Sequence, residues 1–115
     1  MELSEAETMR DVPVLQVSGE VDLATAAQLR DAADELIARR AGLVVIDLSQ
    51  VSFLDSSGLK VLDEMQQRAA DADGRIALVC PQQRIVRLLE ITGLTDRFAI
   101  HSTPEGAADS ENGGG

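Results

Sequence analysis

The fold is decided by the stretch Val44-Val45-Ile46-Asp47-Leu48-Ser49-Gln50-Val51-Ser52-Phe53-Leu54-Asp55-Ser56-Ser57-Gly58-Leu59-Lys60-Val61-Leu62. It opens with three β-branched apolar residues, which predict a buried strand of a parallel sheet. Asp55, Ser56 and Ser57 follow, residue types whose side-chain oxygens accept hydrogen bonds from the unpaired N–H groups of a first helical turn. Apolar residues then return at helical spacing: Leu59, Leu62, Met65 and Ala69. The stretch therefore predicts a strand, a turn and a helix that begins at Asp55-Ser56-Ser57.

The serine hydroxyl at this helix start has two interpretations. It is expected to be exposed, near an acidic side chain and beside the positive end of a helix dipole, so it could be a functional group. It could also be a helix cap and nothing more. Helix caps are common and functional serines are rare, so the residues alone favour the cap.

The part of the chain before this stretch predicts two strands and a helix. Residues 2–8 could form an edge strand, and residues 12–17 alternate as a strand does. The loop that follows contains Asp22, which on its own is best explained as a cap or a solvated charge. Thr25 and Gln28 have the spacing of a capping box at the start of the next helix. The inner face of that helix is predicted from its apolar positions: Leu29, Ala32, Ala33, Leu36 and Ile37.

The part after this stretch predicts two more strands with a helix between them. Residues 76–79 read as a buried strand, and Cys80 at its end reads as a small buried apolar residue and not as a reactive thiol. Pro81 is expected to open the next helix, at the position where its missing N–H costs nothing. Gly93-Leu94 is expected to end that helix as a Schellman cap. Residues 98–100 form the last predicted strand.

Strands that alternate with helices predict an α/β domain with a mostly parallel sheet, in the order β-β-α-β-α-β-α-β. We expect residues 1–103 to form this single domain. Residues 104–115 are expected to be a flexible acidic and Gly-rich tail with at most one helical turn, because their composition buries little apolar surface. Loops at the carboxyl ends of parallel strands emerge on one side of a sheet. Asp22 and Ser56 are therefore expected to share a surface if their strands are neighbours.

Composition argues against several classes of function. The net charge of −10 and an aromatic content of 2% argue against nucleic-acid binding, and the acidic charge argues against docking on anionic lipid. One Cys excludes an internal disulfide and is typical of a reducing cytoplasm. One His and one Cys argue against an ordinary metal site. No apolar run approaches the roughly 20 residues of a membrane span, and no signal peptide or phosphate-binding Gly-rich loop is visible. The sequence thus predicts a cytoplasmic protein that is not an enzyme and holds no cofactor.

The chain resembles the STAS domain of bacterial anti-sigma factor antagonists. The residues that carry the resemblance are Asp47-Leu48, Asp55-Ser56-Ser57-Gly58-Leu59 and, upstream, Gly19-Glu20-Val21-Asp22. The resemblance spans roughly Val12 to His101. It implies that a partner kinase, which is also the anti-sigma factor, phosphorylates Ser56, and that a phosphatase reverses this step. It further implies a partner-binding surface that consists of Asp22, Asp55, Ser56, Ser57, Gly58 and Lys60.

Two features depart from the pattern of that family. Lys60 stands where these antagonists commonly have Gly or another small residue. Its ammonium could reach a phosphate on Ser56 or clash with the kinase, or it could simply be an exposed helix lysine. The family also has a closing helix, which the composition after Pro104 does not predict.

Three functions compete on the sequence. In the first, the unphosphorylated protein binds a serine-kinase anti-sigma factor and frees a sigma factor, and phosphorylation of Ser56 switches it off. In the second, the chain is a non-switching STAS subunit that binds the ATPase of a lipid-transport complex. The third is an enzyme or nucleotide-binding domain, for which no motif is present. Only the first predicts release of the partner when ATP is supplied.

Overall fold

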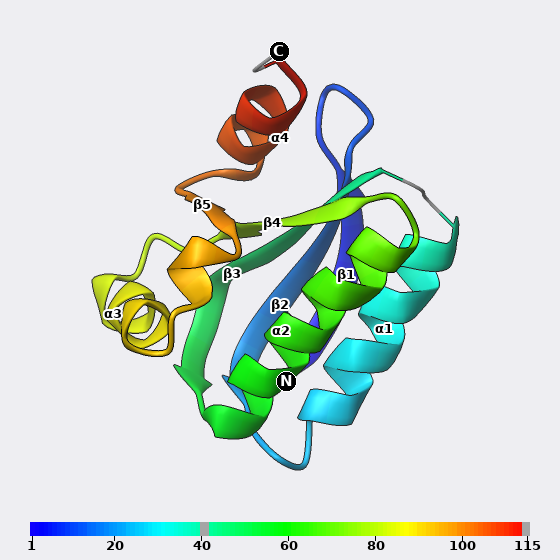
Figure 1. Ribbon diagram of the computed structural model, residues 1–115. Helices are drawn as coiled ribbons and strands as arrows, with labels where there is room; N and C mark the ends of the chain where they lie inside the picture. Colours follow the sequence, from blue (N-terminus) through cyan, green and yellow to red (C-terminus); the bar gives the residue numbers. More distant parts are fainter. Residues whose placement is uncertain (40–41, 114–115) are drawn as a thin grey trace.

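The computed structural model describes residues 1–39 and 42–113, which form one five-stranded sheet with helices on both faces (Figure 1). The strands lie in the order β1-β2-β3-β4-β5, with β1 antiparallel to β2 and the other neighbours parallel. The strands are β1 (Glu2–Glu7), β2 (Pro13–Val21), β3 (Leu43–Leu54), β4 (Arg75–Val79) and β5 (Ala99–His101). The helices are α1 (Ala26–Arg39), α2 (Ser56–Asp71), α3 (Gln83–Ile91), a short 3-10 turn η1 (Leu94–Asp96) and α4 (Pro104–Gly113). The predicted α/β class and element order are confirmed.

The sheet separates a large core from a small one. Helices α1, α2 and α3 pack on one face, where Ile46, Leu62 and Leu89 are fully buried. Helix α4 packs on the opposite face, where Ala107 and Ala108 cover Val45. Both faces of the central strand β3 are therefore buried, which explains its unbroken run of apolar residues.

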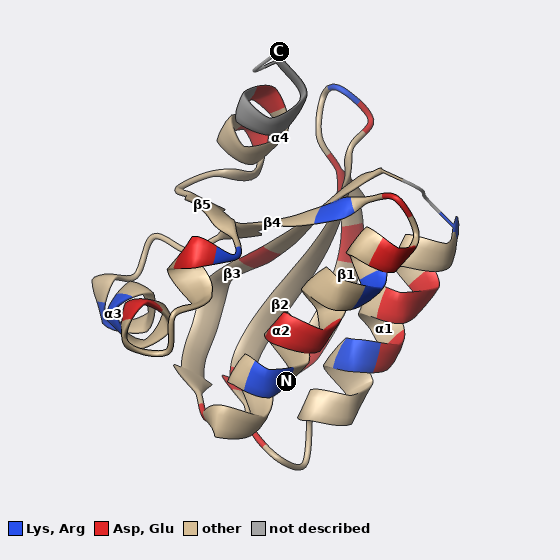
Figure 2. Cartoon of the chain, viewed as in Figure 1, with Lys and Arg blue, Asp and Glu red and all other residues tan. Residues whose placement is uncertain are grey.

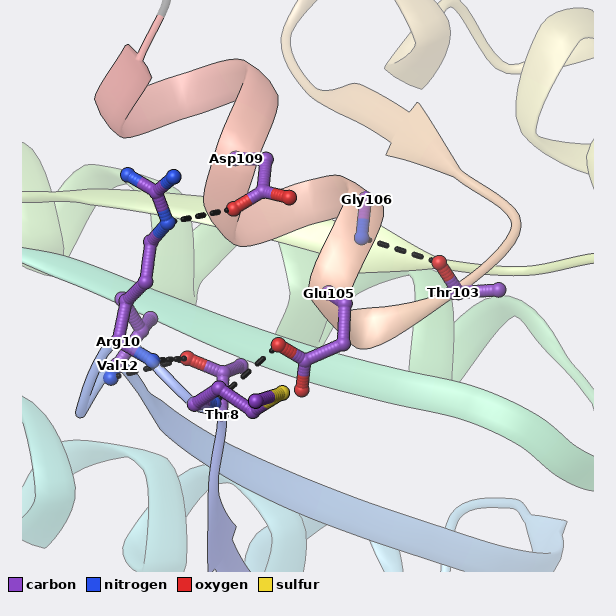
Figure 3. Close-up of polar contacts among 8 residues, drawn as sticks. Thr8, Arg10, Val12, Thr103, Glu105, Gly106 and Asp109 are labelled. Atoms are coloured by element: carbon purple, nitrogen blue, oxygen red, sulfur yellow. Dashed lines mark hydrogen bonds and ion pairs between the residues drawn. The ribbon is translucent and has the colours of Figure 1, made fainter.

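Helix α4 corrects the expectation of at most one turn after Pro104. The helix continues to Gly113, and its Ala107 and Ala108 are completely buried. Small side chains allow the helix backbone to approach the sheet closely, so two alanines are enough to seat it. Thr103 caps the helix, because its Oγ1 accepts a 3.0 Å hydrogen bond from the Gly106 N–H (Figure 3).

The loop between β1 and β2 makes polar contacts with α4 (Figure 3). Arg10 Nε forms a 2.8 Å ion pair with Asp109, and the backbone N–H of Met9 donates a 3.2 Å hydrogen bond to Glu105. Within the loop, Thr8 Oγ1 accepts hydrogen bonds from the backbone N–H groups of Arg10 and Val12. The segment after Pro104 is thus joined to the domain by both apolar and polar contacts.

Two predicted helix ends differ in detail. Helix α3 begins at Gln83 with Gln82 as its N-cap, so Pro81 precedes the helix and does not open it. The C-terminal end of α3 agrees with the predicted Schellman cap, since Gly93 has a φ of 81° directly after the C-cap and Leu94 is buried. The predicted capping box at the start of α1 is displaced by one turn, as described below.

Candidate docking and modification surface

Ser56 is the first residue of α2, and the cap of that helix is Asp55. One carboxylate oxygen of Asp55 accepts hydrogen bonds from the backbone N–H groups of Ser57 at 2.9 Å and Gly58 at 3.1 Å. The interpretation of Ser56 as a cap is therefore wrong. Its side chain is exposed, and its hydroxyl makes no hydrogen bond within the described part of the chain. Modification of this hydroxyl would therefore break no hydrogen bond among the described residues.

Neighbouring strands bring the loop after β2 beside the start of α2. Strand β2 pairs with β3, with Val21 opposite Leu54. Asp22 and Asp55 are therefore the first residues after the two paired strands. The Asp55 N–H donates a 3.2 Å hydrogen bond to the carbonyl oxygen of Val21 and so joins the two loops directly. The condition for Asp22 and Ser56 to share a surface, that their strands are neighbours, is therefore met.

Asp22 and Thr25 form a reciprocal capping box ahead of α1. Asp22 Oδ1 accepts a 3.1 Å hydrogen bond from the Thr25 N–H, and Thr25 Oγ1 accepts a 3.0 Å hydrogen bond from the Asp22 N–H. The box therefore begins at Asp22, three residues before the predicted one at Thr25 and Gln28. The plain explanation of Asp22 as a cap is confirmed, and any contact with a partner would be an additional role.

Gly58 is required by the packing beneath the site. A β-carbon at this position would lie 2.4 Å from Leu54 Cδ1 and 2.9 Å from Val21 Cγ1. Both side chains are buried, and Val21 is stiff because it is β-branched. Gly58 thus lets the first turn of α2 settle on the ends of β2 and β3. Its role seen in the structure is to place Ser56, since Gly58 itself is buried.

Lys60 lies between two open hollows on α2. Ser56, Lys60 and Arg97 line one hollow of about 370 Å³, and Leu23, Ser57 and Lys60 line another of about 270 Å³. Arg97 is already paired, with its Nε 2.7 Å from Asp63. Lys60 is exposed and makes no ion pair with any described residue. The structure therefore places every predicted site residue in one region, around the first two turns of α2 and the loop after β2.

Two apolar side chains of this region were missed by the sequence reasoning. Leu23 is 81% exposed beside Asp22, and Phe53 is 49% exposed near the end of β3. Scattered apolar side chains at a protein surface need no explanation, but Leu23 lines a hollow together with Ser57 and Lys60. An apolar residue within a polar loop, as at Leu23, was the available signal.

Gln82 is a second residue that sequence reasoning did not single out. Its Nε2 lies 2.9 to 3.0 Å from three carbonyl oxygens, those of Leu48, Ser49 and Val51. These residues lie beyond Asp47, the last residue of β3 that pairs with β4, and β3 also shifts in register against β2 here. Gln82 thereby anchors the irregular part of β3 that leads to Ser56.

The thiol of Cys80, the other candidate for reactivity in the sequence, is not activated. Cys80 is buried, as expected, and this burial raises the pKa of its thiol, which disfavours the reactive thiolate. Asp and Glu positions are spread over many elements of the chain (Figure 2). Even so, residues 1–39 and 42–113 contain no group of three His, Cys, Asp or Glu side chains placed to hold a metal ion. None of the helices within these residues has the length and hydropathy of a membrane span.

Comparisons with known proteins agree with this fold. The model of the STAS domain family matches residues 4–107, and the chain therefore belongs to the STAS domain family. It is 36% identical over 103 residues to the anti-sigma-F factor antagonist RsfB of Mycobacterium tuberculosis, covering 90% of this chain and 84% of RsfB. It is 33% identical over 92 residues to the anti-sigma-B factor antagonist of Bacillus subtilis, covering 80% and 84%.

A solved structure extends the likeness to three dimensions. The crystal structure of an anti-sigma factor antagonist from Mycobacterium paratuberculosis aligns with a TM-score of 0.83 at 31% identity, covering 96% of this chain and 95% of that chain. The resemblance expected from the Asp55-Ser56-Ser57-Gly58 motif is thus confirmed. Both of these relatives are named anti-sigma factor antagonists, and neither name refers to a transport complex.

Proposed function

We propose that the protein is an anti-sigma factor antagonist switched by phosphorylation of Ser56. Unphosphorylated, it binds a serine kinase that is also an anti-sigma factor, and a sigma factor is released. The kinase then transfers a phosphoryl group from ATP to Ser56 Oγ, and the hydroxyl proton is lost. The observation that carries this proposal is the exposed Ser56 hydroxyl at the start of α2, with no hydrogen bond among the described residues.

Phosphorylation acts on the interface and leaves the fold intact. A phosphate adds about −1.5 to −2 charges. Because Asp55 and not Ser56 caps α2, no hydrogen bond of the domain is broken by the modification. A kinase surface that fits a neutral hydroxyl would have to bury this charge without a counter-charge, which is costly enough to end binding.

The partner surface contains an apolar anchor near the switch residue. Leu23 is 81% exposed and lines a hollow with Ser57 and Lys60, which supply polar contacts around it. Interfaces of this kind place most of their binding energy in a few apolar side chains surrounded by polar contacts. Leu23 is therefore proposed as a direct contact, and Gly58 as a residue that only positions the surface.

The protein acts as substrate and regulator and not as a catalyst. Ser56 lies in a first helical turn with Asp55 committed to the cap, and none of the described residues accepts a hydrogen bond from its hydroxyl as an activating base would. Its place of action is the cytoplasm, where the kinase finds ATP and the sigma factor. A phosphatase restores the serine.

The proposal is tested by incubation of the protein with a candidate kinase from the same genome, with and without ATP. We expect one phosphate, mapped by mass spectrometry to Ser56, and release of the kinase as it accumulates. Ser57→Ala is the matched control and should still be phosphorylated. Ser56→Ala should bind and stay bound. A STAS subunit of a transport complex would show neither phosphorylation nor release.

A further inference from the structure

We infer that Lys60 is an internal counter-ion for a phosphate group on Ser56. The inference rests on the proposed function, because it concerns the modified form of the same serine. Lys60 is the only lysine in the chain, and the other nine members of the Lys and Arg set are arginines. It lies in α2, four residues after Ser56.

The spacing on the helix brings the two side chains together. Residues four apart lie on one face of a helix, and long side chains lean toward the helix N-terminus. The Lys60 stem therefore runs toward Ser56 and not away from it. Both residues line the same open hollow, which leaves room for a phosphate between them.

The ammonium of Lys60 has no competing partner in the described part of the chain. Asp63, three residues further on, forms an ion pair with Arg97, whose Nε lies 2.7 Å from Asp63 Oδ1. Glu64 stands four residues after Lys60, in the less favourable order for a helical ion pair, and no such pair forms. Arg30 of α1 lines the second hollow together with Lys60 and Glu64, which places another cation near Glu64.

Other groups at the start of α2 cannot take this role. The N–H groups of Ser57 and Gly58 are occupied by the Asp55 carboxylate, and this carboxylate repels a phosphate. Arg97 also lines the hollow but neutralises Asp63. Lys60 is thus the one unpaired cation among the residues that line the Ser56 hollow.

An ion pair with Lys60 favours the doubly charged form of the phosphate. The second pKa of a phosphoserine lies near 6, and a neighbouring cation lowers it. The pair also reduces the charge that the phosphorylated protein presents to its kinase. Lys60 therefore makes the switch less complete than a small residue at this position would.

The test is a ³¹P NMR titration of the full chain with phosphoserine incorporated at position 56 during translation. This route needs no kinase, so its outcome is independent of the proposed function, which is tested by modification of Ser56 and by release of the kinase. We expect Lys60→Gln to raise the second pKa of the phosphate by about half a unit at low salt, the scale of an exposed ion pair. Lys60→Arg should restore it, and 1 M salt should erase the difference.

Arg39→Gln is the matched control, since it removes the same charge at the far end of α1 (Figure 1). It should leave the phosphate pKa unchanged. An unchanged pKa in Lys60→Gln would overturn the inference. An equal rise in Arg39→Gln would also overturn it, because the effect would then come from net charge and not from a local pair.

Discussion

The backbone N–H of Asp55 donates a 3.2 Å hydrogen bond to the carbonyl oxygen of Val21. This bond continues the pairing of β2 and β3 beyond the last opposed residues, Val21 and Leu54. It ties the loop that contains Asp22 to the residue that caps α2. A change in either loop is therefore expected to affect the position of the other, and the surface around Ser56 behaves as one unit.

Replacement of Asp22 separates its structural role from a binding role. Asp22→Ala removes the acceptor for the Thr25 N–H and should lower the free energy of unfolding by about 0.5–2 kcal/mol, measured by urea denaturation. Asp22→Asn keeps a capping oxygen but removes the charge, so it should be nearly as stable as the parent. Weaker kinase binding by Asp22→Asn would then report a direct charge contact, and unchanged binding would show that Asp22 only shapes the loop.

Replacement of Gln82 should loosen the irregular part of β3. Gln82→Ala leaves three carbonyl oxygens without their donor and should cost about 1–3 kcal/mol in urea denaturation. Gln82→Glu should cost at least as much, because a carboxylate cannot donate to these carbonyls. The exposed neighbour Gln83 provides the control, and Gln83→Ala should change stability by less than about 0.5 kcal/mol. Equal stability of all three variants would contradict the role assigned to Gln82.

Truncations test where the domain ends. Deletion of residues 110–115 should leave the melting temperature nearly unchanged, because it keeps Ala107, Ala108 and the Arg10–Asp109 ion pair. Deletion from Pro104 uncovers Val45, Ala77 and Val79 on the sheet face, so it should lower the melting temperature by several degrees. If both deletions are silent, α4 is not part of the stable domain and the original boundary at residue 103 holds.

Much of this molecule was predictable because its main signals are local. The apolar run from Val44 to Ile46 and the helical spacing after Gly58 predicted β3 and α2 directly. Helix α4 was missed because its burial depends on Ala107 and Ala108 meeting a sheet face built from distant strands. Composition alone gives two alanines little weight.

The candidate site was predictable in position but not in detail. The motif located Ser56, yet the choice of Asp55 as the cap depends on backbone geometry, since Ser and Asp are both good caps. The capping box at Asp22 was misplaced by one turn because Thr25 and Gln28 also fit the pattern. Gln82 carries no sequence signal, since its three acceptors lie more than thirty residues earlier in the chain.

The most direct test is the affinity of the protein for a candidate kinase and anti-sigma factor from the same genome, with serine or phosphoserine at position 56. Isothermal titration calorimetry with a non-hydrolysable ATP analogue keeps each form unchanged during the measurement. We expect the phosphorylated form to bind about 100-fold more weakly or worse, the effect of about 3 kcal/mol from a phosphate charge that Lys60 neutralises only in part. Ser56→Ala should bind like the parent. Equal affinity of the serine and phosphoserine forms would contradict the proposal that Ser56 is the switch.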